Sequence, residues 1–441
     1  MGNTVCSSGK HDIKRDRTKS TRFILKGNKL YFDKKIDEAI LYYMEAVEAD
    51  VDNDNAYTNW GCALHQQGKY DEAISRYRLA VEVNENSKEA YYYWGYTHYV
   101  KKEYEEAITQ FEKAAKVNPT FTKIYKTWGH ALSKLGRYEE ATKKYQKAKE
   151  LGPKSDDVLY NYGLALAAME QYKAATEKYM EAVEINPNDV DIYIAWGWAL
   201  YKLKRYEEAS SVYHQAIELN PRSAIGYCHW GITLYKQKEY NEAVIKLSKA
   251  IEITPDFIKA YIECGKALYA QKKYQEVIEV FESAVRINPN KSDVYTHWGL
   301  ALHQLGNYSE AIEKYEKAVE LEPKNGKIYQ VWGRALDKLE RTDEAIKKYE
   351  KSIELEPSNY LAYGHLAIDL CKTGNPEKAE IHFKQATKLD PVGGSLLYRY
   401  YHWGTGSSSG RPSGVMHKFN STTKSAGFED DELYSSLSSP R

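Results

Sequence analysis

The sequence lacks an excess of charge of either sign, and this absence argues against one large class of function. Of its 441 residues, 62 are lysine or arginine and 62 are aspartate or glutamate, so the formal net charge is zero. Proteins dedicated to nucleic acid normally carry a strong basic excess. We therefore expect no nucleic-acid partner.

Long apolar runs are also absent. No stretch approaches the roughly 20 consecutive apolar residues that a membrane-spanning helix needs. Residues 10–29 are polar and basic, without the apolar segment of a secretory signal. Both features predict a cytoplasmic chain.

The sequence also contains few cysteines and none of the common catalytic motifs. Cys6, Cys62, Cys228, Cys264 and Cys371 form no CxxC pair, so we expect free thiols in a reducing compartment. The sequence holds no P-loop, HExxH, GxSxG or dinucleotide fingerprint. The chain is therefore predicted not to be an enzyme and to need no cofactor.

A repeat of 34 residues is what the sequence does contain. Glycine recurs at this interval from Gly27 to Gly333, and tryptophan usually precedes it. Alanine stands twelve residues after the glycine, with Val277 as the exception, and proline stands 24 residues after it from Pro119 onward. Proline separates one unit from the next because it disfavours a helical predecessor. Each repeat thus predicts two short amphipathic helices that stack on their neighbours.

This pattern resembles the tetratricopeptide repeat (TPR) family. The resemblance covers residues 20–393 as eleven repeats and implies an all-α fold, a right-handed superhelix of helix–turn–helix units. Residues 1–19 are then a disordered basic N-terminus, 394–404 a capping helix and 405–441 a disordered tail. The array is also similar to the superhelical TPR arm of O-linked N-acetylglucosamine transferases, without a catalytic domain.

The aromatic stretch YYYWGYTHYV at 91–100 shows how one helix divides between core and surface. Tyr91, Trp94, Gly95 and His98 follow an i, i+3, i+4, i+7 stripe and are predicted to face the second helix of the repeat. Repeat positions 2, 5, 6, 9, 12 and 13, counted with glycine at position 8, lie on an adjoining face. In the TPR family this face lines a concave groove that binds ligands, and we call it the groove face.

The groove face is rich in aromatic and basic side chains. It carries eleven lysines or arginines against six acids, although the whole chain is neutral. This balance favours an extended protein or peptide partner, in particular an acidic or phosphorylated one. The candidate protein-binding residues are Tyr92, Tyr93, Tyr96, Tyr99, Lys123, Lys126, His130, Asn161, Trp198, Tyr201, His229, Tyr235, Lys266, Tyr269, His297, His303 and Arg334.

Other interpretations of these residues remain open. In one alternative, a tyrosine on the groove face serves packing between repeats and not partner binding. The histidines are scattered along the array, so we expect no metal site and only a modest pH sensitivity of binding. The chain is alternatively a soluble structural subunit of a larger trafficking or ciliary assembly, or the targeting arm of a separate glycosyltransferase.

The N-terminal sequence MGNTVCSSGK predicts a lipid anchor. Gly2 fits an N-myristoylation start, and Cys6 is a palmitoylation candidate. Residues 10–29 hold eight lysines or arginines, and a basic patch stabilises the marginal membrane binding of one acyl chain. A position on a membrane surface, peripheral and cytosolic, is therefore expected.

The C-terminal end raises two further expectations. The segment after Pro391 resembles a first helix with no second helix, and its aromatic residues predict closure of the core or self-association. The tail ends in FEDDELYSSLSSPR, which is acidic and complements the basic groove face. If the tail folds into that face, deletion of residues 405–441 should raise peptide affinity.

Overall fold

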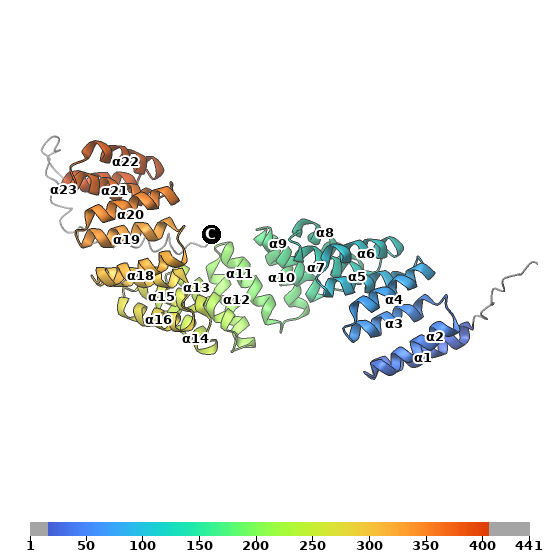
Figure 1. The fold of residues 1–441 in the computed structure, drawn as a ribbon. Coiled ribbons are helices and arrows are strands. Elements are labelled where there is room, and N and C mark those ends of the chain that lie inside the picture. Colours follow the sequence, from blue (N-terminus) through green and yellow to red (C-terminus); the bar gives the residue numbers. More distant parts are fainter. Residues whose placement is uncertain (1–15, 405–441) are drawn as a thin grey trace, which may run out of the picture. The chain divides into compact units, whose positions relative to one another are not determined.

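The computed structural model describes residues 16–404, with the side chains of 399–404 excepted. Within this range the chain forms only helices joined by short turns (Figure 1), which confirms the predicted all-α fold. The helices fall into two compact units, divided between Lys204 and Arg205.

In the first unit every helix contacts the next, and the first helices of successive repeats also contact one another. Its helices are α1 (Arg17–Phe32), α2 (Ile36–Ala49), α3 (Asp54–Gln66), α4 (Tyr70–Val83), α5 (Lys88–Val100), α6 (Tyr104–Val117), α7 (Thr122–Lys134), α8 (Tyr138–Leu151), α9 (Asp156–Ala168), α10 (Tyr172–Ile185) and α11 (Val190–Lys202). The first helix begins at Arg17, three residues before the predicted start of the array.

The second unit continues the same alternation of helices. It contains α12 (Tyr206–Leu219), α13 (Ala224–Lys236), α14 (Tyr240–Ile253), α15 (Ile258–Ala270), α16 (Tyr274–Ile287), α17 (Ser292–Gln304), α18 (Tyr308–Leu321), α19 (Gly326–Lys338), α20 (Thr342–Leu355), α21 (Tyr360–Lys372), α22 (Pro376–Leu389) and α23 (Gly393–Gly404). Odd-numbered helices from α1 to α21 are therefore the first helices of the eleven repeats.

The turn between the two helices of each repeat uses one residue in the left-handed region. Its φ ranges from 58° at Glu170 to 83° at Gly306, and seven of the eleven turn residues are not glycine. A left-handed residue at this point ends a helix by satisfying its last carbonyl groups. The chain thus reverses direction at the same place in every repeat.

The repeated glycine is required by a close approach between the two helices. A Cβ atom at Gly163 would lie 2.5 Å from Tyr179 Cε1, and one at Gly333 would lie 2.5 Å from Tyr349 Cε1. The side chain sixteen residues after this position, aromatic in every repeat except for Leu247, fills the centre of its repeat. The side chains at this position are at most 2% exposed: Tyr43, Tyr77, Phe111, Tyr145, Tyr179, Tyr213, Leu247, Phe281, Tyr315, Tyr349 and Phe383.

The hydroxyl groups of several of these buried tyrosines reach side chains of the groove face. Tyr43 donates to Asn28 Oδ1 at 2.8 Å, and Tyr349 donates to Asp337 Oδ2 at 2.7 Å. A buried tyrosine needs such a partner for its hydroxyl. Part of the large tyrosine content therefore serves the core.

Tryptophan at position 7 pairs with a basic residue from the second helix of the same repeat. The lysine or arginine stands sixteen residues further along the chain, and its charged group lies over the aromatic ring at 3.3–5.8 Å from the centroid. The pairs are Trp60–Arg76, Trp128–Lys144, Tyr162–Lys178, Trp230–Lys246, Trp298–Lys314 and Trp332–Lys348. In repeat 8 both positions are instead apolar, with Cys264 and Val280.

The last helix, α23, closes the core of the second unit. Leu397 is 3% exposed, and the space it occupies would clash with any Cβ at Gly364. Tyr398 packs edge-on against Phe383, with ring centroids 5.3 Å apart. The other predicted aromatic residues of this segment, Tyr400, Tyr401 and Trp403, lie among those whose side chains the structure does not describe.

Candidate protein-interaction site

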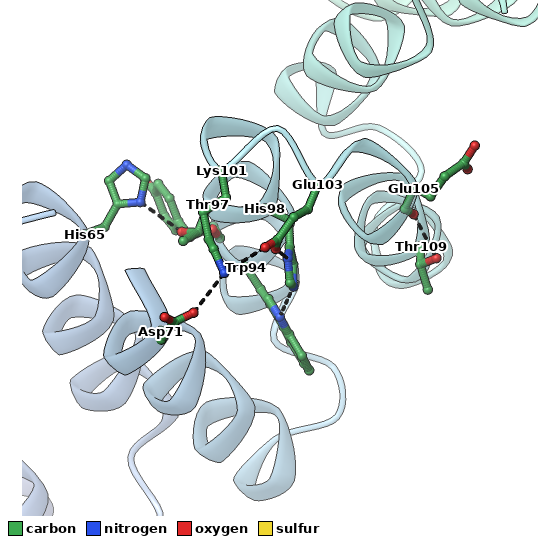
Figure 2. A network of polar contacts seen from close by, with 10 residues as sticks. His65, Asp71, Trp94, Thr97, His98, Lys101, Glu103, Glu105 and Thr109 are labelled. Carbon is green, nitrogen blue, oxygen red and sulfur yellow. Dashed lines mark hydrogen bonds and ion pairs between the residues drawn. The ribbon is translucent and has the colours of Figure 1, made fainter. Parts of the chain in front are cut away.

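A polar network fixes α5, the helix of the aromatic stretch, to the preceding repeat (Figure 2). Trp94 Nε1 donates to His98 Nε2 at 2.9 Å, and His98 Nδ1 lies 2.6 Å from Glu103 Oε2. Lys101 Nζ lies 2.8 Å from both Glu103 Oε1 and Asp71 Oδ1, and Asp71 belongs to α4. Tyr91, Trp94 and His98 were predicted as core, but all three are only half-buried. His98 carries these hydrogen bonds and stacks on Trp94, with ring centroids 6.4 Å apart.

A row of aromatic rings lies on the groove face of α5. Tyr92 stacks on Tyr96 with centroids 6.3 Å apart, and Tyr96 stacks on Tyr99 at the same distance. His65 of α3 extends the row, because its ring centroid lies 5.5 Å from that of Tyr96 and its Nδ1 lies 2.9 Å from Thr97 Oγ1. We call His65, Tyr92, Tyr96 and Tyr99 the aromatic row. All four rings are half-buried, so each retains an exposed part.

Two of the predicted groove tyrosines also pack between repeats. Tyr92 contacts Phe121 and Phe111, with centroids 5.4 and 6.1 Å away. Tyr93 turns to the preceding repeat and stacks on Tyr77 at 6.4 Å. Burial raises the pKa of Tyr93 to about 12 and also raises the pKa of Tyr92. The packing function therefore applies to both residues, and most clearly to Tyr93.

Next to the aromatic row, repeats 4 and 5 supply basic and amide side chains. Lys123 is exposed, whereas Lys126 forms an ion pair with Asp157. Asn161 Nδ2 donates to Asp157 Oδ1 at 3.0 Å, so this carboxylate holds both predicted partners. The excess positive charge of the groove face is thus partly neutralised within the repeats themselves.

The seventeen predicted residues differ in exposure. Lys123 is exposed. The half-buried residues are Tyr92, Tyr93, Tyr96, Tyr99, Lys126, His130, Asn161, Trp198, Tyr201, His229, Tyr235 and Arg334. Trp198 and Tyr201 of α11 stack with centroids 5.0 Å apart.

Four predicted groove residues of the second unit do not form an open surface. Lys266, Tyr269, His297 and His303 are between 2% and 7% exposed. Lys266 is held by Glu263, with Nζ 3.0 Å from Oε1. This burial corrects the expectation that every groove-face position is available to a partner.

The histidines also differ from the sequence expectation. Burial lowers the pKa of His229 to about 4 and that of His297 to about 3. Burial likewise lowers the pKa of His65 and His130. All four are therefore neutral at physiological pH. Any pH sensitivity of partner binding that depends on these histidines is expected only under acidic conditions.

A cavity at one edge of the groove face was missed by sequence reasoning. It has a volume of about 420 Å³ and lies between repeats 4 and 5. Its lining consists of Thr120, Phe121, Thr122, Lys123, Lys126, Ala148, Lys149, Pro153, Lys154, Ser155, Val158 and Leu159. Three separate segments contribute, two of which include turns that a helix-face analysis does not consider. The one available signal was Gly152, which stands after the second helix, where five of the other ten repeats carry asparagine.

Within residues 16–404, no group of three or more histidine, cysteine or acidic side chains is placed to hold a metal ion. The four described cysteines are free, as predicted, and Cys6 lies outside the described residues. Burial raises the pKa of Cys62 and Cys228 to about 12. No helix in the described part is long and apolar enough to cross a membrane.

Comparison with family models identifies the repeat. Models described as TPR repeat or tetratricopeptide repeat match residues 129–170, 156–189, 197–238, 231–272, 265–306, 292–325 and 331–394. A model described as anaphase-promoting complex, cyclosome, subunit 3 matches residues 66–148. The chain belongs to the tetratricopeptide-repeat family.

Solved TPR structures resemble the chain at low identity. Yeast Tom70 is 17% identical and matches 88% of this chain and 95% of its own, with a TM-score of 0.45. The Cut9–Hcn1 structure is 11% identical over 87% and 96%, with a TM-score of 0.43. YrrB, described as a TPR protein with an unusual peptide-binding site, is 26% identical over 52% and 97%, with a TM-score of 0.33. A search of curated proteins found no match.

Proposed function

We propose that this TPR protein is a non-enzymatic scaffold that binds extended segments of partner proteins on its groove face. The aromatic row of the first unit is the observation that carries this proposal. Stacked, partly exposed aromatic rings next to basic side chains are typical of the residues that dominate protein interfaces. The polar network around His98 supports the row by holding α5 in place, which reduces the ordering cost of binding.

The predicted residues are expected to contribute unequally to partner binding. Tyr96 contacts other members of the row, and Tyr99 contacts Tyr96 and the ring of Tyr104 at the start of α6. Tyr99 also packs against the buried cluster of α6 to α9, so Tyr96 is the best candidate for direct contact and Tyr99 the second. Tyr93 is assigned to packing between repeats. An acidic partner is favoured because Lys123 and Lys134 are exposed on the neighbouring α7.

Peptide display against the full chain, with matched variants, tests this function. Tyr96→Ala is expected to reduce binding of selected peptides by about tenfold, as a central aromatic contact does. Tyr91→Ala removes a ring of the same helix from the core-facing stripe and controls for stability. If both variants reduce binding equally, or neither does, the groove face of α5 is not the binding site.

We also propose that lipidation at Gly2, and at Cys6, holds the scaffold on a membrane. Both residues lie outside the described range. The support within it is α1, which contains Arg17, Lys19, Arg22, Lys26 and Lys29, all exposed, and no acidic residue. Such a basic helix adds the electrostatic attraction to anionic lipid that one acyl chain needs.

Exposed apolar side chains on α1 also support membrane association. Leu25 is 65% exposed and Phe32 is 79% exposed. Intact-mass spectrometry of protein from its own cells, beside Gly2→Ala and membrane fractionation, tests the anchor. A myristoyl mass that is lost together with membrane association in Gly2→Ala is expected. A free N-terminus in the soluble fraction would contradict it.

A further inference from the structure

The cavity between repeats 4 and 5 contains basic side chains but no acid. Lys123 and Lys126 come from α7, Lys149 from the end of α8, and Lys154 from the turn before α9. Thr122 and Ser155 add hydroxyl groups to the same lining. A ligand in this cavity therefore meets hydrogen-bond donors with positive charge on several sides.

Two of the four lysines are already neutralised. Lys126 pairs with Asp157, and Lys149 Nζ lies 2.6 Å from Glu181 Oε2. Lys123 and Lys154 form no ion pair within the part of the chain that the structure describes. The cavity thus has an uncompensated charge of about +2, which matches the charge of −1.5 to −2 on a phosphate monoester at neutral pH. A single carboxylate would balance only half of it.

The remaining walls are apolar. Phe121, Val158 and Leu159 line the cavity together with Ala148 and Pro153. An apolar wall beside lysines suits a phosphate carried on an organic group, because the carrier packs against the wall while the phosphate meets the charges. The same composition is less suitable for a fully hydrated inorganic ion.

The turn that forms one side of the cavity departs from the repeat. The second helix of repeat 4 ends at Leu151, and the capping residue that follows is Gly152, whose φ of −120° is ordinary. A Cβ atom there would lie 2.6 Å from Thr122 Cγ2. Glycine is therefore needed for space, and it lets the turn with Lys154 and Ser155 approach the start of α7.

From these contacts we infer that the cavity between repeats 4 and 5 binds a phosphate monoester on a partner peptide. Lys123 and Lys154 provide the charge, and the aromatic row of the neighbouring repeat receives the adjoining peptide. The inference rests on the proposed scaffold function and names the chemistry of its partner.

Fluorescence polarisation with the full chain tests the inference. The probes are two degenerate peptide pools that differ only in phosphorylation of a central serine. We expect the phosphorylated pool to bind about tenfold more tightly, and Lys123→Ala and Lys154→Ala each to remove most of that preference. Lys116→Ala replaces an exposed lysine at the end of α6 that lines neither the cavity nor the groove face; it is the matched control and should leave the preference unchanged.

The outcomes separate the inference from the proposed function. Equal affinity for both pools, or a preference that survives Lys123→Ala with Lys154→Ala, overturns the inference. If Tyr96→Ala still reduces binding of the unphosphorylated pool, the scaffold function stands without it. Competition by phenyl phosphate supports the phosphate site, and a phenyl phosphate affinity equal to that of the pool assigns the site to small phosphate esters instead of peptides.

Discussion

The two compact units are built from the same 34-residue repeat, yet their groove faces differ. In the first unit Tyr96 and Tyr99 keep exposed ring surface, whereas in the second unit Lys266 and Tyr269, at the same repeat positions, are 6% and 2% exposed. The backbone pattern is the same at both places. Availability to a partner is therefore decided by the neighbouring side chains and not by the repeat position alone.

The charged clusters of the two units also differ in kind. The first unit places lysines around an acid-free cavity lining. In the second unit Asp337 and Asp369 lie together, and Lys372 Nζ is 3.7 Å from Asp337 Oδ1 and 2.8 Å from Asp369 Oδ1. The first unit thus has a cavity with two lysines that are unpaired within residues 16–404, and the second unit has two neighbouring carboxyl groups that share one lysine.

The largest expected effect tests whether the two units are stable independently. Gly163→Val places a side chain against Tyr179 in the first unit, and Gly333→Val does the same against Tyr349 in the second. Overpacking of this kind costs about 1–3 kcal/mol or more. Because repeats contact mainly their neighbours, we expect loss of hydrogen-exchange protection only in the unit that carries the substitution.

Leu164→Ala is the control for this pair, since Leu164 is adjacent to Gly163 but exposed. It should leave the exchange pattern nearly unchanged. Loss of protection across both units after either glycine substitution would show that the array unfolds as one body.

The sequence predicted the fold because almost every repeat carries the two residues of one packed contact, with Leu247 and Ala367 as the exceptions. Glycine at position 8 and the ring at position 24 occupy one packed contact, so their spacing alone defines the helix pair. The left-handed turn residue was not predicted, because lysine, glutamate and glycine all occupy it. Local geometry there is imposed by the two helices and overrides the residue's own preference.

The candidate site was less predictable for a different physical reason. Helical periodicity places a residue on a face but does not say which neighbours cover it. It correctly placed Tyr96 and Tyr99 beside each other, yet it could not distinguish them from Tyr93 or Tyr269. The cavity lining combines helix ends with turns, so no single periodic pattern contains it.

The next largest effect concerns the buried carboxylates of the second unit. Burial, with Asp337 as a further cause, raises the pKa of Asp369 from its ordinary 3.8 to about 7. The folded chain therefore holds a proton that the unfolded chain has lost, and stability should fall as pH rises from about 4 through 7. Asp369→Asn removes this titration.

Melting temperatures at pH 5 and pH 8 measure this effect. The difference between the two pH values should be smaller for Asp369→Asn than for the unchanged chain, with the variant gaining relative stability at pH 8. An identical pH dependence in both proteins would show that Asp369 does not hold a proton in the folded state.

A smaller effect is expected from the acidic C-terminal tail, which lies outside the described residues. We predict that the tail binds the basic groove face of the second unit. A fluorescent peptide of residues 427–438 should then bind the chain 1–404 about tenfold more tightly than the full chain, because the attached tail competes at high effective concentration. Equal binding to both chains, or binding that is lost with Tyr96→Ala, would place the tail elsewhere.

The smallest effect compares one interaction that both units share. Lys144 lies over Trp128 in the first unit and Lys348 over Trp332 in the second, each with Nζ 3.3 Å from the ring centroid. Burial lowers the pKa of both lysines, so each charge is partly removed from water. Lys→Met keeps most of the apolar stem and removes the charge, and we expect a loss of about 0.5–1 kcal/mol from each cation–π pair. Chemical denaturation of both variants measures the loss. Equal losses would show that the units share their internal energetics and differ mainly in what their groove faces expose, whereas a loss in one unit alone would mean that the repeat itself is not equivalent in the two.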